Sequence, residues 1–416
     1  QGEANLKRVL GARHLLLLGV GAIIGAGIFV MTGTAAANYA GPAVILSFVM
    51  AAVACGFAGL CYAEFASMMP VSGSAYSYTY STLGEVVAWF IGWNLVLEYL
   101  FAASSVAVGW SGYLNSFLTT YGAGIPAALA QAPFHYSAEA KAFVSTGSIV
   151  NLPAVLIVAA ISGLCYRGIT QSAWVNALIV AIKVTVIVLF LGFAVQYINP
   201  DNWHPFIPAN EGGTRFGMEG VARGAAVVFF AYIGFDAVST AAGEAKNPQR
   251  DMPIGILGSL AVCTVLYIAV AATLTGLMPF AQLDTPKPVS TALENYPTLG
   301  WLKTAVEIGA IAGLSSVILV MLMGQPRIFY AMSVDGLLPK FFRKVHPTHK
   351  TPYIGTLITG TLAAVIAGLF PVTILGELVS IGILLALQHR HATVSTQHPK
   401  GQGQVVDVAL FEAVFN

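Results

Sequence analysis

Long, uninterrupted runs of apolar residues recur along this chain of 416 residues and decide its structural class. A helix of about 20 residues crosses the roughly 30 Å of hydrocarbon in a bilayer. Interruption by charges, prolines and polar clusters leaves ten apolar segments, at about 15–34, 42–65, 86–117, 152–166, 172–196, 217–242, 253–277, 301–330, 353–370 and 374–387. The sequence therefore predicts an all-α polytopic membrane protein, whose last segment is too short to span.

Composition excludes the main alternative classes. Only 9% of the residues are charged, against roughly 25% in soluble domains, so a soluble surface could not be covered. Continuous apolar runs disfavour an outer-membrane barrel, whose strands alternate apolar and polar residues. The net charge of +1 predicts no nucleic-acid partner. The sequence shows no phosphate-binding GxxxxGK[ST] motif, no metal-ligand spacing and no catalytic constellation, so we expect no cofactor, no metal and no enzymatic activity.

The positive charges between the segments set the orientation. With the N-terminus in the cytoplasm, ten lysines and arginines fall on the cytoplasmic side and four on the outer side. Cytoplasmic loops carry the excess of these residues in membrane proteins. We therefore expect a multi-pass protein with residues 1–14 as a cytoplasmic N-terminus.

Glycines crowd the middle of the first segment, at Gly19, Gly21, Gly25 and Gly27. Two interpretations are open. Small residues let helices approach closely, whereas glycine also weakens a helix by roughly 1 kcal/mol against alanine and can mark an unwound point.

The sixth segment carries a similar interruption, because Gly234, Phe235 and Asp236 fall in mid-span. Five spans separate the two interruptions, so the second unit enters the membrane in the opposite orientation. This pattern predicts two inverted five-helix repeats, 15–196 and 197–387, with a binding site between the interrupted helices.

A broken helix exposes a positive N-terminal end and a negative C-terminal end close together. A zwitterion fits that pair better than a sugar or a lone ion. We expect its carboxylate to bind the N–H groups of Gly25, Ala26 and Gly27, and its ammonium to bind the carbonyls of Ile23 and Ile233.

Of the charged residues inside the predicted spans, three are candidates for function. Lys183 is roughly 17 Å from either end of its helix, too far to reach water, and must face protein or a cavity. It is either a group that binds and releases a proton or a permanent cation that holds helices together. Glu98 is either structural or part of transport. Asp236 either caps the half-helix that follows it or contacts a substrate ammonium.

Five blocks resemble the amino acid–polyamine–organocation (APC) superfamily of transporters, in particular bacterial relatives of the cationic amino acid transporters. They are GVGAIIGAGIFV (19–30), CYAEFASMMPVSGSAYSY (61–78), GWNLVLEY (92–99), VFFAYIGFDAVSTAAGEAKNPQRDMPIGI (228–256) and GQPRIFYAMSVDGLLPK (324–340). The resemblance implies the LeuT-type fold with helices 1 and 6 broken. It also implies secondary amino acid transport, without ATP, across a bacterial inner (cell) membrane.

The resemblance also implies roles for single residues. It places Lys183 where related transporters hold a sodium ion, between helices one, five and eight, and Glu98 near the substrate ammonium or the proton path. Phe230 corresponds to an outer gate and Met321 to the side-chain end of the pocket, with core packing as the alternative for both. We expect the hydroxyl of Tyr267 to hydrogen-bond near the site, unless it only packs.

Relatives in this superfamily continue into helices 11 and 12, which are apparently missing here. The expected tenth helix is truncated near Leu387, and an atypical polar tail occupies 388–416.

These features predict a proton-coupled symporter for small neutral L-amino acids such as alanine, with Lys183, Glu98 and Tyr267 serving the proton. Two alternatives are a proton-independent exchanger of arginine and lysine, and a membrane amino acid receptor that does not transport. The expected partners are the amino acid, the proton and the lipid bilayer. A small single-span membrane subunit is a further candidate partner.

Overall fold

The structure is a computed structural model that describes residues 10–68, 74–137, 142–168, 173–240, 242, 245–349, 351–376 and 378. The tail at 388–416 and most of the tenth segment, 374–387, lie outside the described residues. Five helical stretches of the described part are long and apolar enough to cross a bilayer. The expected all-α membrane architecture is therefore confirmed.

The first nine predicted segments all become helical, and seven of them are single helices. These are α3 (Val44–Met68), α5 (Glu85–Thr120), α7 (Leu152–Tyr166), α8 (Ala173–Ala194), α11 (Pro248–Leu277), α13 (Gly300–Val334) and α14 (Tyr353–Leu369). Their apolar composition determines this outcome, because backbone polar groups inside lipid must be satisfied within the same segment.

The first and sixth segments are each divided. The first contains α1 (Ala12–Ile23), a π-helical turn (Gly27–Met31), α2 (Thr32–Ala35) and a second π-helical turn (Ala36–Ala40). The sixth contains α9 (Gly217–Val228), a 3₁₀ turn (Phe229–Tyr232) and α10 (Ala237–Thr240).

The connections hold short elements that the apolar pattern does not predict. These are α4 (Ser74–Leu83), α6 (Ala127–Ala130), α12 (Pro288–Glu294), an antiparallel hairpin of β1 (Phe134–Ser137) and β2 (Ala142–Ser145), and 3₁₀ turns at Gly41–Ala43, Val195–Tyr197, Pro200–Trp203, Phe280–Leu283, Pro297–Leu299 and Lys340–Arg343. In the hairpin, Phe134 pairs with Ser145.

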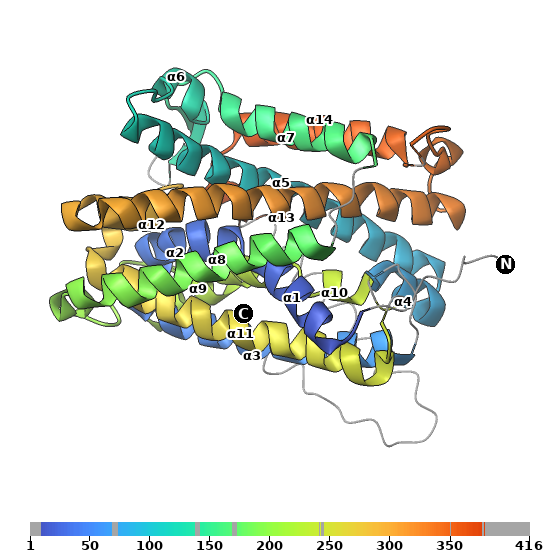
Figure 1. The fold of residues 1–416 in the computed structure, drawn as a ribbon, viewed down its shortest axis with the longest axis horizontal. Coiled ribbons are helices and arrows are strands. Elements are labelled where there is room, and N and C mark those ends of the chain that lie inside the picture. The colour runs from blue at the N-terminus through green and yellow to red at the C-terminus, as the bar shows by residue number, and fades with distance from the viewer. Residues whose placement is uncertain are drawn as a thin grey trace.

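The long helices form flanks around the divided ones. α5 and α13 run side by side along the molecule, α7 pairs with α14 on one flank, and α3 pairs with α11 on the other (Figure 1). α1 packs against α11 and α8. α12 lies at the end of the bundle remote from the N-terminal end (Figure 1). Both divided helices therefore lie inside the bundle.

Candidate functional site

The first divided helix breaks at Ile24. α1 ends at Ile23, and Ile24 takes an extended conformation with φ −69° and ψ 103°. Helical structure resumes in the π-helical turn that begins at Gly27. Both interpretations of the glycines hold, for different residues: Gly25 and Gly27 adjoin the break, whereas a Cβ on Gly19 would lie 2.4 Å from the Ser259 hydroxyl of α11.

The second break lies at Ile233 and Gly234. After the 3₁₀ turn, Ile233 is extended with ψ 138°, and Gly234 has a φ of +107°. Residues with a Cβ rarely adopt this positive φ. α10 then begins at Ala237. Both predicted breaks are thus confirmed.

The two breaks lie against each other. A Cβ on Gly27 would come within 2.4 Å of the Ala231 Cα, and one on Gly234 within 2.8 Å of the Ala22 backbone. Each broken segment therefore presents a glycine to the backbone of the other. The absence of two side chains lets the four helix ends meet at one point.

Tyr267 of α11 joins the broken segments. Its hydroxyl is 2.8 Å from the Ile23 carbonyl and 2.7 Å from the Ala231 carbonyl, and its side chain is fully buried. A hydroxyl has one proton to donate, so it can fully satisfy only one of these oxygens at a time. The Ile23 carbonyl was expected to be free for a substrate ammonium, but it contacts the Tyr267 hydroxyl. Its second lone pair is still available.

Lys183 of α8 contacts the same break from another direction. Its Nζ donates to the carbonyls of Gly21 and Ile24, both at 2.8 Å. The side chain is fully buried, and a Cβ on Gly313 of α13 would lie 2.9 Å from its Cε. The prediction that Lys183 faces protein, between helices one, five and eight, is confirmed. Its ammonium satisfies carbonyls at the end of α1 that the break leaves without helical partners.

Asp236 follows the second break, and its partner was not predicted from the sequence. The Tyr99 hydroxyl of α5 donates to the Asp236 Oδ2 at 2.7 Å, and a Cβ on Gly324 of α13 would meet the Tyr99 ring at 2.7 Å. Tyr99 directly follows Glu98, which is itself buried. That neighbouring carboxylate was the one signal that could have drawn attention to Tyr99.

The predicted pocket-lining residues are buried close to the breaks. Phe230 lies in the 3₁₀ turn of the second divided helix, and Met321 lies on α13; both are buried. A Cβ on Gly25 would lie 2.8 Å from Val317, one helical turn before Met321. The face of α13 that carries Val317 and Met321 thus reaches the first break. Sequence reasoning missed Val317, which has no distinguishing local signal.

The arrangement offers complementary charges to a small zwitterion. The N–H groups of Gly25, Ala26 and Gly27 lie at the start of a helical segment, where the first N–H groups lack helical partners. Carbonyls of Ile23 and Ala231 face Tyr267 on the other side of the break. Among the described residues, no group of three His, Cys, Asp or Glu side chains could hold a metal ion.

Known membrane transport proteins are similar to this chain in sequence. The chain is 52% identical over 386 residues to the branched-chain amino acid permease BcaP of Bacillus subtilis, covering 92% of this chain and 80% of that protein. It is 50% identical over 382 residues to the methylthioribose transporter of the same organism, covering 92% and 79%.

A crystal structure of MhsT in complex with L-phenylalanine shares the fold, with a TM-score of 0.66 at 13% identity over 98% of this chain and 97% of that one. The expected LeuT-type fold is thereby confirmed. The family model described as amino acid permease matches residues 10–387. Over that range, the chain belongs to the amino acid permease family of multi-pass membrane proteins.

Proposed function

We propose that this protein is a secondary active amino acid transporter that works by alternating access. The observation that carries the proposal is the direct contact of the two helix breaks, Gly27 against Ala231 and Gly234 against Ala22. A zwitterion bound beside this contact, on the N–H and carbonyl groups that the two breaks leave without helical partners, contacts both inverted repeats at once. Its binding free energy can therefore shift the equilibrium between their relative positions.

Lys183 is our candidate for the proton-coupling residue. Its charged form donates to the Gly21 and Ile24 carbonyls and so ties α8 to the end of α1. Loss of the proton removes the positive charge that strengthens these hydrogen bonds. Protonation then favours the arrangement in which α1 is held, and deprotonation lets α1 move. Tyr267 and Glu98 complete the proposed proton-linked group, while a permanent cation at Lys183 is the alternative.

The proposed substrates are small neutral L-amino acids, alanine among them. Val317 packs against Gly25 at the first break, and the buried Met321 follows one helical turn later on α13, so we expect short apolar side chains to fit best. A second cation near Lys183 would be repelled, so we place arginine and lysine exchange second. The names of the similar proteins extend the list to be tested to branched-chain amino acids and methylthioribose.

The proposed location is a bacterial cell membrane, with the N-terminus in the cytoplasm. The proposal also includes a small single-span membrane subunit as a candidate partner. A receptor would bind the amino acid without taking it up, so an uptake measurement distinguishes a receptor from a transporter.

The test uses the purified chain in proteoliposomes with labelled alanine. We expect an inward proton gradient to accelerate uptake, and a proton ionophore to abolish the acceleration. Unlabelled alanine, leucine, arginine and methylthioribose are added as competitors. Gradient-driven uptake with neutral competition supports the proposal, whereas uptake indifferent to the gradient refutes proton coupling. Binding without any uptake supports the receptor.

Lys183→Met tests the coupling residue. The substitution preserves an unbranched side chain and removes the charge. We expect uptake driven by the gradient to fall at least about tenfold, with alanine binding retained. Lys246→Met is the matched control, because Lys246 is exposed. Equal acceleration by the gradient in Lys183→Met and in the unmodified chain would exclude Lys183 from coupling.

A further inference from the structure

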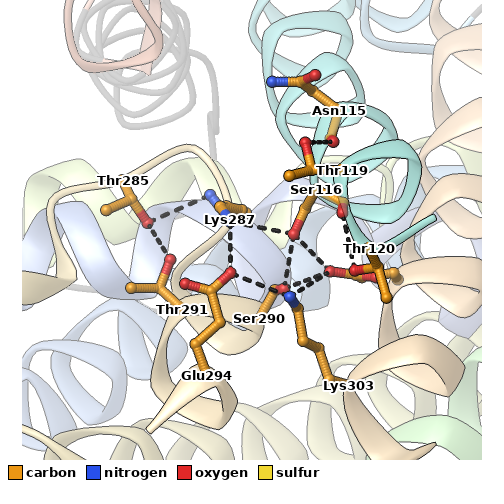
Figure 2. Close-up of polar contacts among 11 residues, drawn as sticks. Asn115, Ser116, Thr119, Thr120, Thr285, Lys287, Ser290, Thr291, Glu294 and Lys303 are labelled. Carbon is orange, nitrogen blue, oxygen red and sulfur yellow. Dashed lines mark hydrogen bonds and ion pairs between the residues drawn. The ribbon is translucent and has the colours of Figure 1, made fainter. Parts of the chain in front are cut away.

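A second polar cluster lies at the end of the bundle remote from the N-terminal end. Figure 2 shows side chains of α5, of α12 and its preceding loop, and of α13 pointing toward one another. The cluster comprises Ser116, Lys287, Ser290, Glu294, Lys303 and Glu307. None of them belongs to the site at the helix breaks.

Glu307 is the centre of this cluster. Its side chain is fully buried. Its Oε1 accepts hydrogen bonds from the Ser116 hydroxyl at 2.5 Å and the Ser290 hydroxyl at 2.6 Å. Ser116 belongs to α5 and Ser290 to α12. One carboxylate oxygen of α13 therefore holds three helices together.

Two lysines surround this centre. Lys303 Nζ lies 3.8 Å from Glu307 Oε1 and 3.2 Å from Glu294 Oε1. Lys287 Nζ donates to the Ser116 hydroxyl at 3.0 Å and to Glu294 at 2.7 Å. α12 is thus attached to both α5 and α13 by charged side chains (Figure 2).

The segment that these contacts hold covers the second half of the broken first helix. A Cβ on Gly33 of α2 would lie 2.4 Å from the Leu283 carbonyl and 2.5 Å from Pro288. The Tyr113 hydroxyl of α5 also donates to the Phe29 carbonyl at 2.6 Å. The segment 283–294 therefore lies directly against the part of the first helix that follows its break.

We propose that Glu307 is a gate residue of the transport cycle, which fastens the segment 283–294 over the site when this side is closed. The inference rests on the proposed function and, with the N-terminus inside, places the gate on the outer face. Opening requires the hydrogen bonds from Ser116 and Ser290 to Glu307 to break together.

The second oxygen of Glu307 supports a releasable contact rather than a permanent one. Its Oε2 is buried and has no hydrogen-bond partner among the described residues. A buried carboxylate oxygen without a partner is unfavourable compared with a hydrated one. Water that enters as the segment lifts would satisfy this oxygen, so opening recovers part of the free energy lost with the two serine contacts.

The experiment measures access to Val289, a residue next to Ser290 that is 2% exposed. The four native cysteines are replaced by alanine and Val289→Cys is introduced. A membrane-impermeant thiol reagent then labels right-side-out vesicles without substrate. We expect Glu307→Gln to raise the labelling rate about tenfold, which corresponds to about 1.4 kcal/mol. The amide still accepts from both serines but lacks the charge that strengthens hydrogen bonds.

Glu211→Gln is the matched control. Glu211 pairs with Arg215 in the connection before α9, on the same side by the proposed topology, and is 56% exposed. It should leave labelling unchanged. An equal rate in Glu307→Gln and the Val289→Cys parent would overturn the gate.

If Glu307→Gln does not fold, Ser116→Ala replaces it, with a rise of about threefold expected and an unchanged rate overturning the gate. Labelling needs no transport. A labelling result that overturns the gate can therefore be distinguished from a failure of gradient-driven uptake, which would overturn the proposed function.

Discussion

Replacement of Gly27 by alanine tests the contact on which the site depends. The new Cβ would lie 2.4 Å from the Ala231 Cα and 2.4 Å from its Cβ, whereas real Cβ contacts essentially never fall below 3.0 Å. One broken segment must therefore retreat by about 0.6 Å or more from the other. Backbone opposes the new methyl, so rotation of a side chain cannot relieve the clash.

Overpacking of this kind costs about 1–3 kcal/mol. A cost of about 3 kcal/mol in the conformation where the breaks meet corresponds to roughly a hundredfold loss of affinity for a ligand that needs this conformation. We expect Gly27→Ala to lower the melting temperature in detergent and to weaken alanine binding by that order, measured by thermal shift against alanine concentration.

Gly56→Ala is the matched control, because Gly56 lies in α3 and a Cβ there would meet nothing within 4 Å. Alanine is favoured over glycine in a helix by about 1 kcal/mol, so this variant should be as stable as the unmodified chain or more so. If Gly27→Ala binds alanine and melts like Gly56→Ala, the two breaks do not meet as described.

Two further predictions concern Tyr99 and the polar cluster around Glu307. Tyr99→Phe removes the hydrogen bond to the buried Asp236, and the loss of a partner from a carboxylate should lower stability by about 1–3 kcal/mol, measured as a fall in the denaturation midpoint; an unchanged midpoint would contradict the contact. Burial raises the pKa of Glu294, but hydrogen bonds and charges from Lys287 and Lys303 outweigh it and hold that pKa below its usual value. Its ion pairs therefore stabilise the fold above the ordinary glutamate pKa of about 4.3, and this contribution is lost as pH falls through the lowered pKa. The melting temperature should accordingly fall more on acidification in the unmodified chain than in Glu294→Gln, and parallel pH profiles would contradict the pairing.

The helices could be predicted because each span must be apolar over a length set by the bilayer. The short elements could not. α12 is seven residues long, and the charged residues that position it find partners on α13, which follows it, and on α5, which is far away in the sequence. No local pattern marks such a helix.

The same division holds within the site and within the polar cluster around Glu307. Glycines in two distant segments indicated both breaks, since a residue without a Cβ marks weak points in a helix. Tyr99 and Glu307 were missed because their partners lie 137 and 191 residues away, at Asp236 and Ser116. Lys183 was found because it lies far from both ends of an apolar run, where a charge is costly wherever its partners are.

The spans, the two helix breaks and the burial of Lys183 in protein follow from the order of the amino acids alone, because polar groups in lipid carry a high free-energy cost. The carbonyls that Lys183 and Tyr267 contact, and the three helices that Glu307 joins, are set by the packing of the bundle. Such contacts depend on distances between segments that become neighbours only when the bundle packs.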